Sequence, residues 1–218
     1  MGIRVCRAEG ANARGVAELT MALILSLVRS VAFSDAALKA RRWDRRKGIE
    51  LAGRTLGVVG CGRIGRPVAQ FALALGMKVL ACDPYPDAAF APGEGFRYAP
   101  LEEVLAAADI ITLHCPPPDG GAALAGRQEI AAMKRGVWLV NTARGALLEA
   151  EAVLEALDDG RVAGLAVDAF EPEPPTDWRL AAHPRVLTTP HVGGFTDESV
   201  DRATSAAVDS LLAALEYP

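Results

Sequence analysis

The stretch Thr55-Leu-Gly-Val-Val-Gly60-Cys-Gly62-Arg-Ile-Gly65 decides the fold of this chain. Residues 55–60 form a short apolar run, which predicts a buried strand. Glycines at 60, 62 and 65 end this run and lead into an amphipathic stretch at 63–75, which predicts a helix. A strand that passes through a glycine turn into a helix is typical of a parallel sheet whose strands alternate with helices.

The rest of the chain repeats this alternation. Apolar, often β-branched runs predict five more strands, at residues 78–82, 109–113, 137–141, 163–168 and 186–189. Helical stretches at 100–108, 128–134 and 148–159 lie between them. Right-handed crossovers of this length wind parallel strands into an open sheet covered on both faces. We therefore predict an α/β fold, a doubly wound parallel sheet of the Rossmann type, with extra helices at 13–40 and 197–215.

Length and composition exclude several classes of protein. The chain has 218 residues, 51% of them hydrophobic, and its 23 lysines and arginines against 27 acidic residues give a net charge of −4. This composition excludes a disordered or collagen-like chain and argues against a nucleic-acid binder. The most apolar stretch, residues 21–33, is interrupted by polar side chains and is too short to span a membrane. We expect neither nucleic acid nor membrane as a partner.

The four cysteines lie far apart, with no CxxC spacing, and the first residues show no charged region followed by the apolar core of a signal peptide. This pattern predicts a protein of the reducing cytoplasm, with no metal site.

The glycines also carry chemistry. Gly60 permits a tight turn, Gly62 lets the backbone approach a pyrophosphate, and Gly65 allows close packing of the helix. Asp83 closes the second predicted strand, where a carboxylate accepts hydrogen bonds from a ribose 2′-hydroxyl and repels a 2′-phosphate. The motif therefore indicates NAD rather than NADP. The alternatives are a methyltransferase, which also holds a ribose in this way, and a glycine turn that binds no ligand.

Three later stretches resemble the C-terminal signatures of the D-isomer-specific 2-hydroxyacid dehydrogenases. They are Asn-Thr-Ala-Arg-Gly at 141–145, Val-Asp-Ala-Phe-Glu-Pro-Glu-Pro at 167–174, and Thr-Pro-His-Val-Gly-Gly at 189–194. Residues 53–60 and Val-Ala-Glu at 16–18 resemble the same family. The resemblance covers nearly the whole chain, and it implies the NAD-binding domain of an oxidoreductase that transfers hydride between nicotinamide and a small 2-hydroxy or 2-oxo acid.

The resemblance also assigns roles to individual residues. It implies that Arg144 binds the substrate carboxylate, that His191 is the general acid and base, and that Glu173 hydrogen-bonds His191. These residue types suit the reaction, because hydride transfer at C2 requires movement of a proton on the C2 oxygen and arginine offers a permanent forked donor. The cofactor contacts that the resemblance implies, beyond the glycines and Asp83, are Arg63, Ile64, Cys115, Pro116, Thr142, Ala143, Arg144, Asp168, His191 and Gly193. His114 and His183 are expected to be structural.

The chain departs from the family at Pro118 and Gly121, which stand where polar residues are usual, so two side-chain contacts to the cofactor are expected to be lost. Family members also carry a second lobe that covers the substrate, and we expect residues 1–218 to be the NAD-binding domain without it. Two readings follow. The chain is the cofactor domain of an enzyme, with slow or no turnover by itself, or it is a non-catalytic NAD(H)-binding regulatory module. The wide apolar surface of the helix at 13–40 predicts a homodimer.

Overall fold

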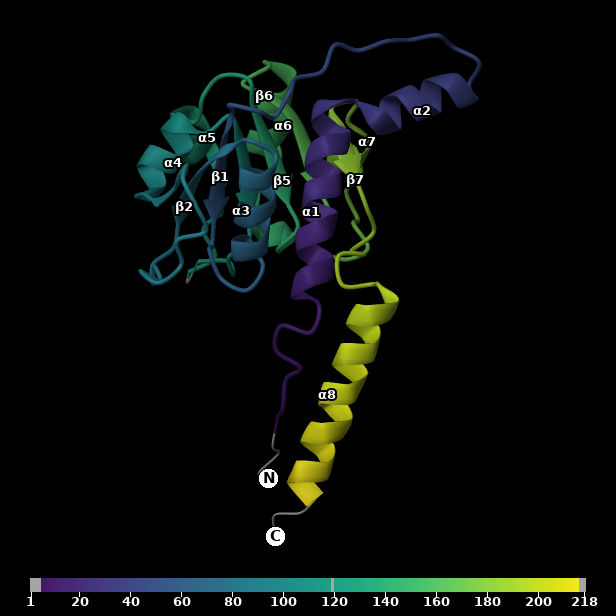
Figure 1. Ribbon diagram of the computed structural model, residues 1–218. Coiled ribbons are helices and arrows are strands. Elements are labelled where there is room, and N and C mark those ends of the chain that lie inside the picture. The colour runs from purple at the N-terminus through teal and green to yellow at the C-terminus, as the bar shows by residue number, and fades with distance from the viewer. Residues whose placement is uncertain (1–4, 119, 216–218) are drawn as a thin grey trace.

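Seven parallel strands form one twisted sheet at the centre of the protein (Figure 1). The computed structural model describes residues 5–118 and 120–215. The strands are β1 (Thr55–Val59), β2 (Lys78–Cys82), β3 (Phe96–Tyr98), β4 (Ile110–Leu113), β5 (Val137–Asn141), β6 (Val162–Val167) and β7 (Val186–Thr188). Their order is β3-β2-β1-β4-β5-β6-β7, so the direction of winding reverses between β1 and β4. The predicted doubly wound α/β sheet is confirmed, and ligands of such sheets bind beside this reversal at the carboxyl ends of the strands.

All six predicted strands are present, and β3 was not predicted. It has only three residues, Phe-Arg-Tyr, and pairs through Val79↔Phe96 at the sheet edge. A run this short contains too few residues to show a period, so only its pairing with β2 identifies it as a strand.

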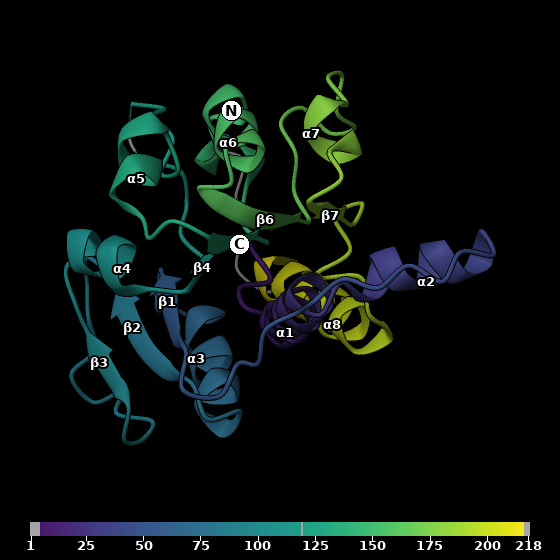
Figure 2. The same cartoon turned by 90° about the horizontal axis from the view of Figure 1, so that it is seen from above.

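Helices cover both faces of the sheet (Figure 2). One face carries α4 (Leu101–Ala107), α5 (Arg127–Ala132) and α6 (Ala150–Asp158), and the other carries α1 (Ala13–Val28) and α3 (Gly65–Ala74). Each face has its own apolar cluster, because alternate side chains of every strand point to opposite sides. A short helix, α7 (Arg179–Ala182), and a single 3₁₀ turn, η1 (Gly145–Leu147), complete the covered part of the fold.

The predicted helix at 13–40 is wrong as a single helix. The structure divides it into α1 and α2 (Val31–Lys39), which meet at 63°. Ser30 adopts a left-handed conformation with φ 52°, and its amide bonds the carbonyl of Leu27, so the regular helical ladder ends there. α1 packs on β5 and β6 beside α3, whereas α2 projects away from the body and buries only Ala37 (Figures 1 and 2).

The last helix, α8 (Asp197–Leu215), also projects from the body (Figure 1). Only Ser199 of its residues is buried, and Leu211 and Leu215 are exposed. Within residues 5–118 and 120–215, no single helix is long and apolar enough to cross a membrane; α1 and α2 meet that criterion only as a bent pair, by length and composition alone.

Candidate active site

The glycine turn joins β1 to α3 at the reversal of the sheet. Gly60 has φ 90°, and a Cβ there would lie 2.7 Å from the carbonyl oxygen of His114. A Cβ on Gly65 would lie 2.1 Å from the carbonyl oxygen of Gly60, so both positions require glycine. A Cβ on Gly62, in contrast, would meet no atom within 4 Å, and no side chain caps the start of α3. The turn therefore offers open space and free helix N–H groups, which fit a pyrophosphate.

Asp83 lies beside this turn, as predicted. Its Oδ2 accepts a hydrogen bond from the amide of Cys61 at 2.8 Å, and its Oδ1 accepts one from the amide of Tyr85 at 2.8 Å. These bonds hold the carboxylate at the end of β2, next to the glycines. The structure thus brings together the residues predicted for the pyrophosphate and for the adenine ribose.

A cavity of about 290 Å³ opens further along the carboxyl edge of the sheet. Nine predicted site residues line it: Ile64, Cys115, Pro116, Thr142, Ala143, Arg144, Asp168, His191 and Gly193. Five residues that were not predicted also line it: Asn12, Val16, His114, Pro117 and Gly194. The cavity is not lined by Gly60, Gly62, Gly65, Asp83 or Glu173, nor by Arg63, whose guanidinium pairs with Glu9 at 2.7 Å.

His191 and Glu173 form a hydrogen-bonded pair. His191 Nδ1 lies 2.7 Å from Glu173 Oε2, and Glu173 Oε1 accepts from the amide of Phe170 at 2.8 Å. The hydrogen bond from His191 holds the pKa of the Glu173 carboxyl below its usual range. Because a carboxylate only accepts, Nδ1 carries the proton, and Nε2 of the neutral ring is left as a base.

Asp168 fixes the loop that carries His191. This carboxylate is 1% exposed and accepts three hydrogen bonds, from Thr189 Oγ1 at 2.6 Å, the Val192 amide at 2.8 Å and the Gly193 amide at 2.9 Å. The three donors lie on both sides of His191, which itself adopts a left-handed backbone with φ 53°. The structure therefore gives Asp168 a role in the placement of His191 that its spacing in the sequence does not indicate.

Arg144 lies on the loop after β5. Asn141 holds this loop, since its side-chain nitrogen donates to the Arg144 carbonyl at 2.8 Å and its oxygen accepts from the Ala143 amide at 3.1 Å. The guanidinium is exposed and donates to the Ala143 carbonyl at 2.7 Å. Most of its donors are therefore available to an anion in the cavity.

Residues 21–193 match the family described as D-isomer specific 2-hydroxyacid dehydrogenase, NAD binding domain. The chain belongs to this family. It is 44% identical over 200 residues to D-3-phosphoglycerate dehydrogenase of Bacillus subtilis, a match that covers 91% of this chain and 38% of the relative. It is 40% identical over 215 residues to hydroxypyruvate reductase of Thermotoga maritima, a match that covers 96% of this chain and 69% of the relative.

Solved structures of the family share the fold. The TT0316 protein of Thermus thermophilus superimposes with a TM-score of 0.87 at 39% identity, over 99% of this chain and 69% of that one. A glyoxylate reductase from Paecilomyes thermophila gives a TM-score of 0.89 at 32% identity, over 95% of this chain and 63% of that one. The chain spans only 38% and 41% of the two bacterial and archaeal phosphoglycerate dehydrogenases that it matches. The predicted family, fold and NAD cofactor are confirmed.

The two histidines that are expected to be structural lie in different surroundings. His183 Nε2 lies 3.2 Å from Asp158 Oδ1, outside the cavity. His114 lines the cavity of this dehydrogenase domain, and its Nε2 lies 3.0 Å from Thr112 Oγ1. Burial lowers the pKa of His114 to about 3, so the ring is neutral near pH 7.

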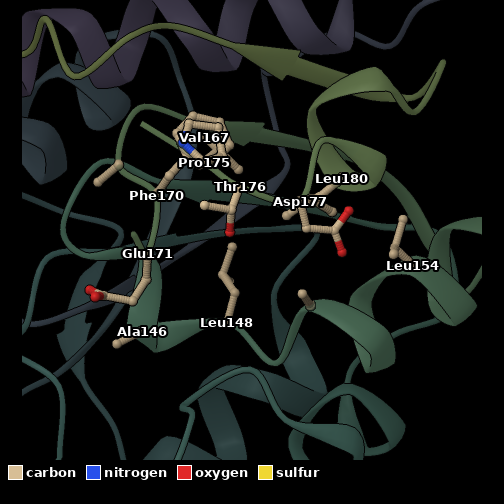
Figure 3. A pocket seen from close by; sticks show the side chains of 13 residues that line it. Ala146, Leu148, Leu154, Val167, Phe170, Glu171, Pro175, Thr176, Asp177 and Leu180 are labelled. Carbon is tan, nitrogen blue, oxygen red and sulfur yellow. The ribbon is translucent and has the colours of Figure 1, made fainter. Parts of the chain in front are cut away.

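A second cavity, of about 280 Å³, is lined in part by Gly145 and Ala146, which follow Arg144 in the chain (Figure 3). Its wall is mainly apolar, from Leu148, Leu154, Phe170 and Leu180, and Glu171, Thr176 and Asp177 also line it. Neither Arg144, Glu173 nor His191 lines it. This cavity therefore does not contain the three predicted catalytic residues.

Proposed function

We propose that this chain is the cofactor-binding domain of an NAD-dependent enzyme that moves hydride between nicotinamide and C2 of a small 2-hydroxy or 2-oxo acid. One observation carries the proposal: Arg144 and His191 line the same cavity, and Glu173 holds His191 through a bond of 2.7 Å. Anion binding and proton transfer, the two tasks that such a reaction leaves to the protein, thus meet in one place.

The side chains divide the work. When bound, NAD supplies the hydride acceptor, or NADH the donor. His191 Nε2 takes the proton of the C2 hydroxyl in oxidation and returns it to the C2 oxygen in reduction, while Glu173 stabilises the charged ring. Arg144 would bind the carboxylate of the substrate through its forked donors and so orient C2 for the transfer.

The residues present fit the cofactor. The open space at Gly62 and the uncapped start of α3 suit the pyrophosphate, where Arg63 and Ile64 would donate from the backbone. Asp83 would hold the adenine ribose, near Cys115 and Pro116. On the nicotinamide side, the residues that would contact the cofactor are Thr142, Ala143, Arg144, Asp168, His191 and Gly193.

The test is oxidation of NADH with hydroxypyruvate, glyoxylate and phosphohydroxypyruvate as alternative substrates. It uses the 218-residue chain and a version that includes any in-frame sequence upstream of Met1. We expect turnover by the longer version that His191→Ala abolishes even at NADH concentrations that saturate the variant. Turnover that is unchanged by His191→Ala would contradict the proposed chemistry, and a longer version that binds NADH but turns over none of these acids would favour the non-catalytic module.

We also propose that the protein is a homodimer. Val31 and Leu38 of the projecting helix α2 are 54% and 56% exposed, and Trp43 just beyond it is 79% exposed. Apolar side chains gathered on a projecting arm are typical of an interface between subunits. Light scattering should give twice the mass of the chain at micromolar concentration, and Trp43→Ala should shift the mass toward the monomer. A monomer in the wild type would refute the proposal.

We further propose a cytoplasmic protein that acts without nucleic acid or membrane. All four cysteines, which lie in the described part of the chain, are free thiols, which suits a reducing compartment. Cell fractionation tests the location: recovery of the protein with the membranes or the exported fraction would contradict it.

A further inference from the structure

A pair of hydroxyl groups joins α1 to the loop after β5. Thr20 Oγ1 and Thr142 Oγ1 lie 2.9 Å apart although the two residues are 122 positions apart in the chain. Thr20 is fully buried in α1, and Thr142 is 6% exposed and lines the cavity. The contact therefore lies directly behind the wall that faces the ligand.

The bond between Thr20 and Val16 favours one direction for this hydrogen bond. Thr20 Oγ1 also donates to the carbonyl of Val16 at 2.8 Å, and a carbonyl can only accept. A hydroxyl has a single proton, so Thr20 has none left for Thr142 and must accept from it. The proton of Thr142 then points toward α1, and the lone pairs of its oxygen remain free to accept.

We infer that Thr20 is a positioning residue, which turns the cavity wall at Thr142 into a hydrogen-bond acceptor. The ligand group that contacts this wall is then a hydrogen-bond donor, such as a hydroxyl of the nicotinamide ribose. A phosphate or carbonyl oxygen can only accept, so it could not form a hydrogen bond with Thr142 there. This inference rests on the proposed function, because it takes Thr142 as part of the nicotinamide half of the cofactor site.

Two substitutions at Thr20 separate the hydroxyl from the shape of the side chain. Thr20→Val keeps the volume and removes the hydroxyl, and Thr20→Ser keeps the hydroxyl and is the matched control. Titration calorimetry measures the dissociation constants of NADH and of ADP, which shares the adenosine and pyrophosphate but lacks the nicotinamide ribose. We expect Thr20→Val to weaken NADH binding about three- to tenfold, to leave ADP binding within about twofold, and Thr20→Ser to bind both ligands like the wild type.

A double variant tests whether Thr20 acts through Thr142. Added to Thr142→Val, Thr20→Val should weaken NADH binding no further, since the bond that it disturbs is already gone. Additive losses, equal losses for ADP and NADH, or unchanged NADH binding in Thr20→Val would each overturn the inference. A wild type that fails to bind NADH would overturn the proposed site itself, and this inference with it.

Discussion

Replacement of Asp168 by asparagine should loosen the loop that carries His191. The carboxylate accepts from Thr189 Oγ1, the Val192 amide and the Gly193 amide at 2.6, 2.8 and 2.9 Å. Asparagine has almost the same shape but offers one oxygen and one NH₂ group. Whichever way the amide turns, at least one backbone N–H of the loop faces another donor and loses its acceptor.

The structure sets the size of this effect. Asp168 is 1% exposed, so water cannot replace the lost acceptor. Loss of one hydrogen bond to a charged group at a buried site costs about 2 to 3 kcal/mol. For a chain of this length each kcal/mol lowers the melting temperature by about 2 to 4 °C, so we expect a decrease of about 4 to 12 °C.

Urea denaturation and hydrogen exchange check the prediction. Asp201→Asn is the matched control, because it makes the same chemical change at an exposed position of α8. Asp168→Asn should lower the unfolding midpoint relative to this control, and the Val192 or Gly193 amide should exchange faster than in the wild type. Equal midpoints for the two variants, with unchanged exchange at both amides, would refute the idea that the carboxylate holds the loop.

Asp83→Ala should weaken NADH binding and narrow the difference between NADH and NADPH in calorimetry, since the carboxylate that repels a 2′-phosphate is gone; an unchanged preference would contradict this. Gly65→Ala should lower stability by about 3 kcal/mol in urea, because its Cβ would lie 2.1 Å from a carbonyl oxygen, whereas Gly62→Ala should fold like the wild type and lose NADH affinity. Burial lowers the pKa of His114 from 6.5 to about 3. Below pH 6.5 the unfolded chain therefore binds a proton at this ring that the folded chain does not, so the free energy of unfolding declines as the pH falls. The slope of this contribution is at most about 1.4 kcal/mol per pH unit, and His114→Gln should lack it; equal slopes for variant and wild type would argue against a neutral buried ring.

The sequence by itself determined the plan of the sheet and most of the site. Strands at residues 55–60 and 137–141 are short apolar runs, and the glycines after the first run restrict the turn to one kind, so local pattern is sufficient there. Arg144, Glu173 and His191 follow successive strands of a parallel sheet, whose carboxyl ends meet at one edge. Their convergence follows from topology without knowledge of any side-chain conformation.

Only the tertiary structure decided how these residues are held. The break at Ser30 is not visible in the sequence, whose helical pattern continues through it; at this end of α1 the amide of Ile49 donates to the carbonyl of Val28, a contact that forms only when the chain has folded. The bonds of Asp168 to the loop of His191, and the direction of the hydroxyl of Thr142, depend on atoms that meet after the chain has folded. Thr20 reads in the sequence as one more small residue of an apolar helix, because the partner that gives it a role is brought to it by packing across the face of the sheet.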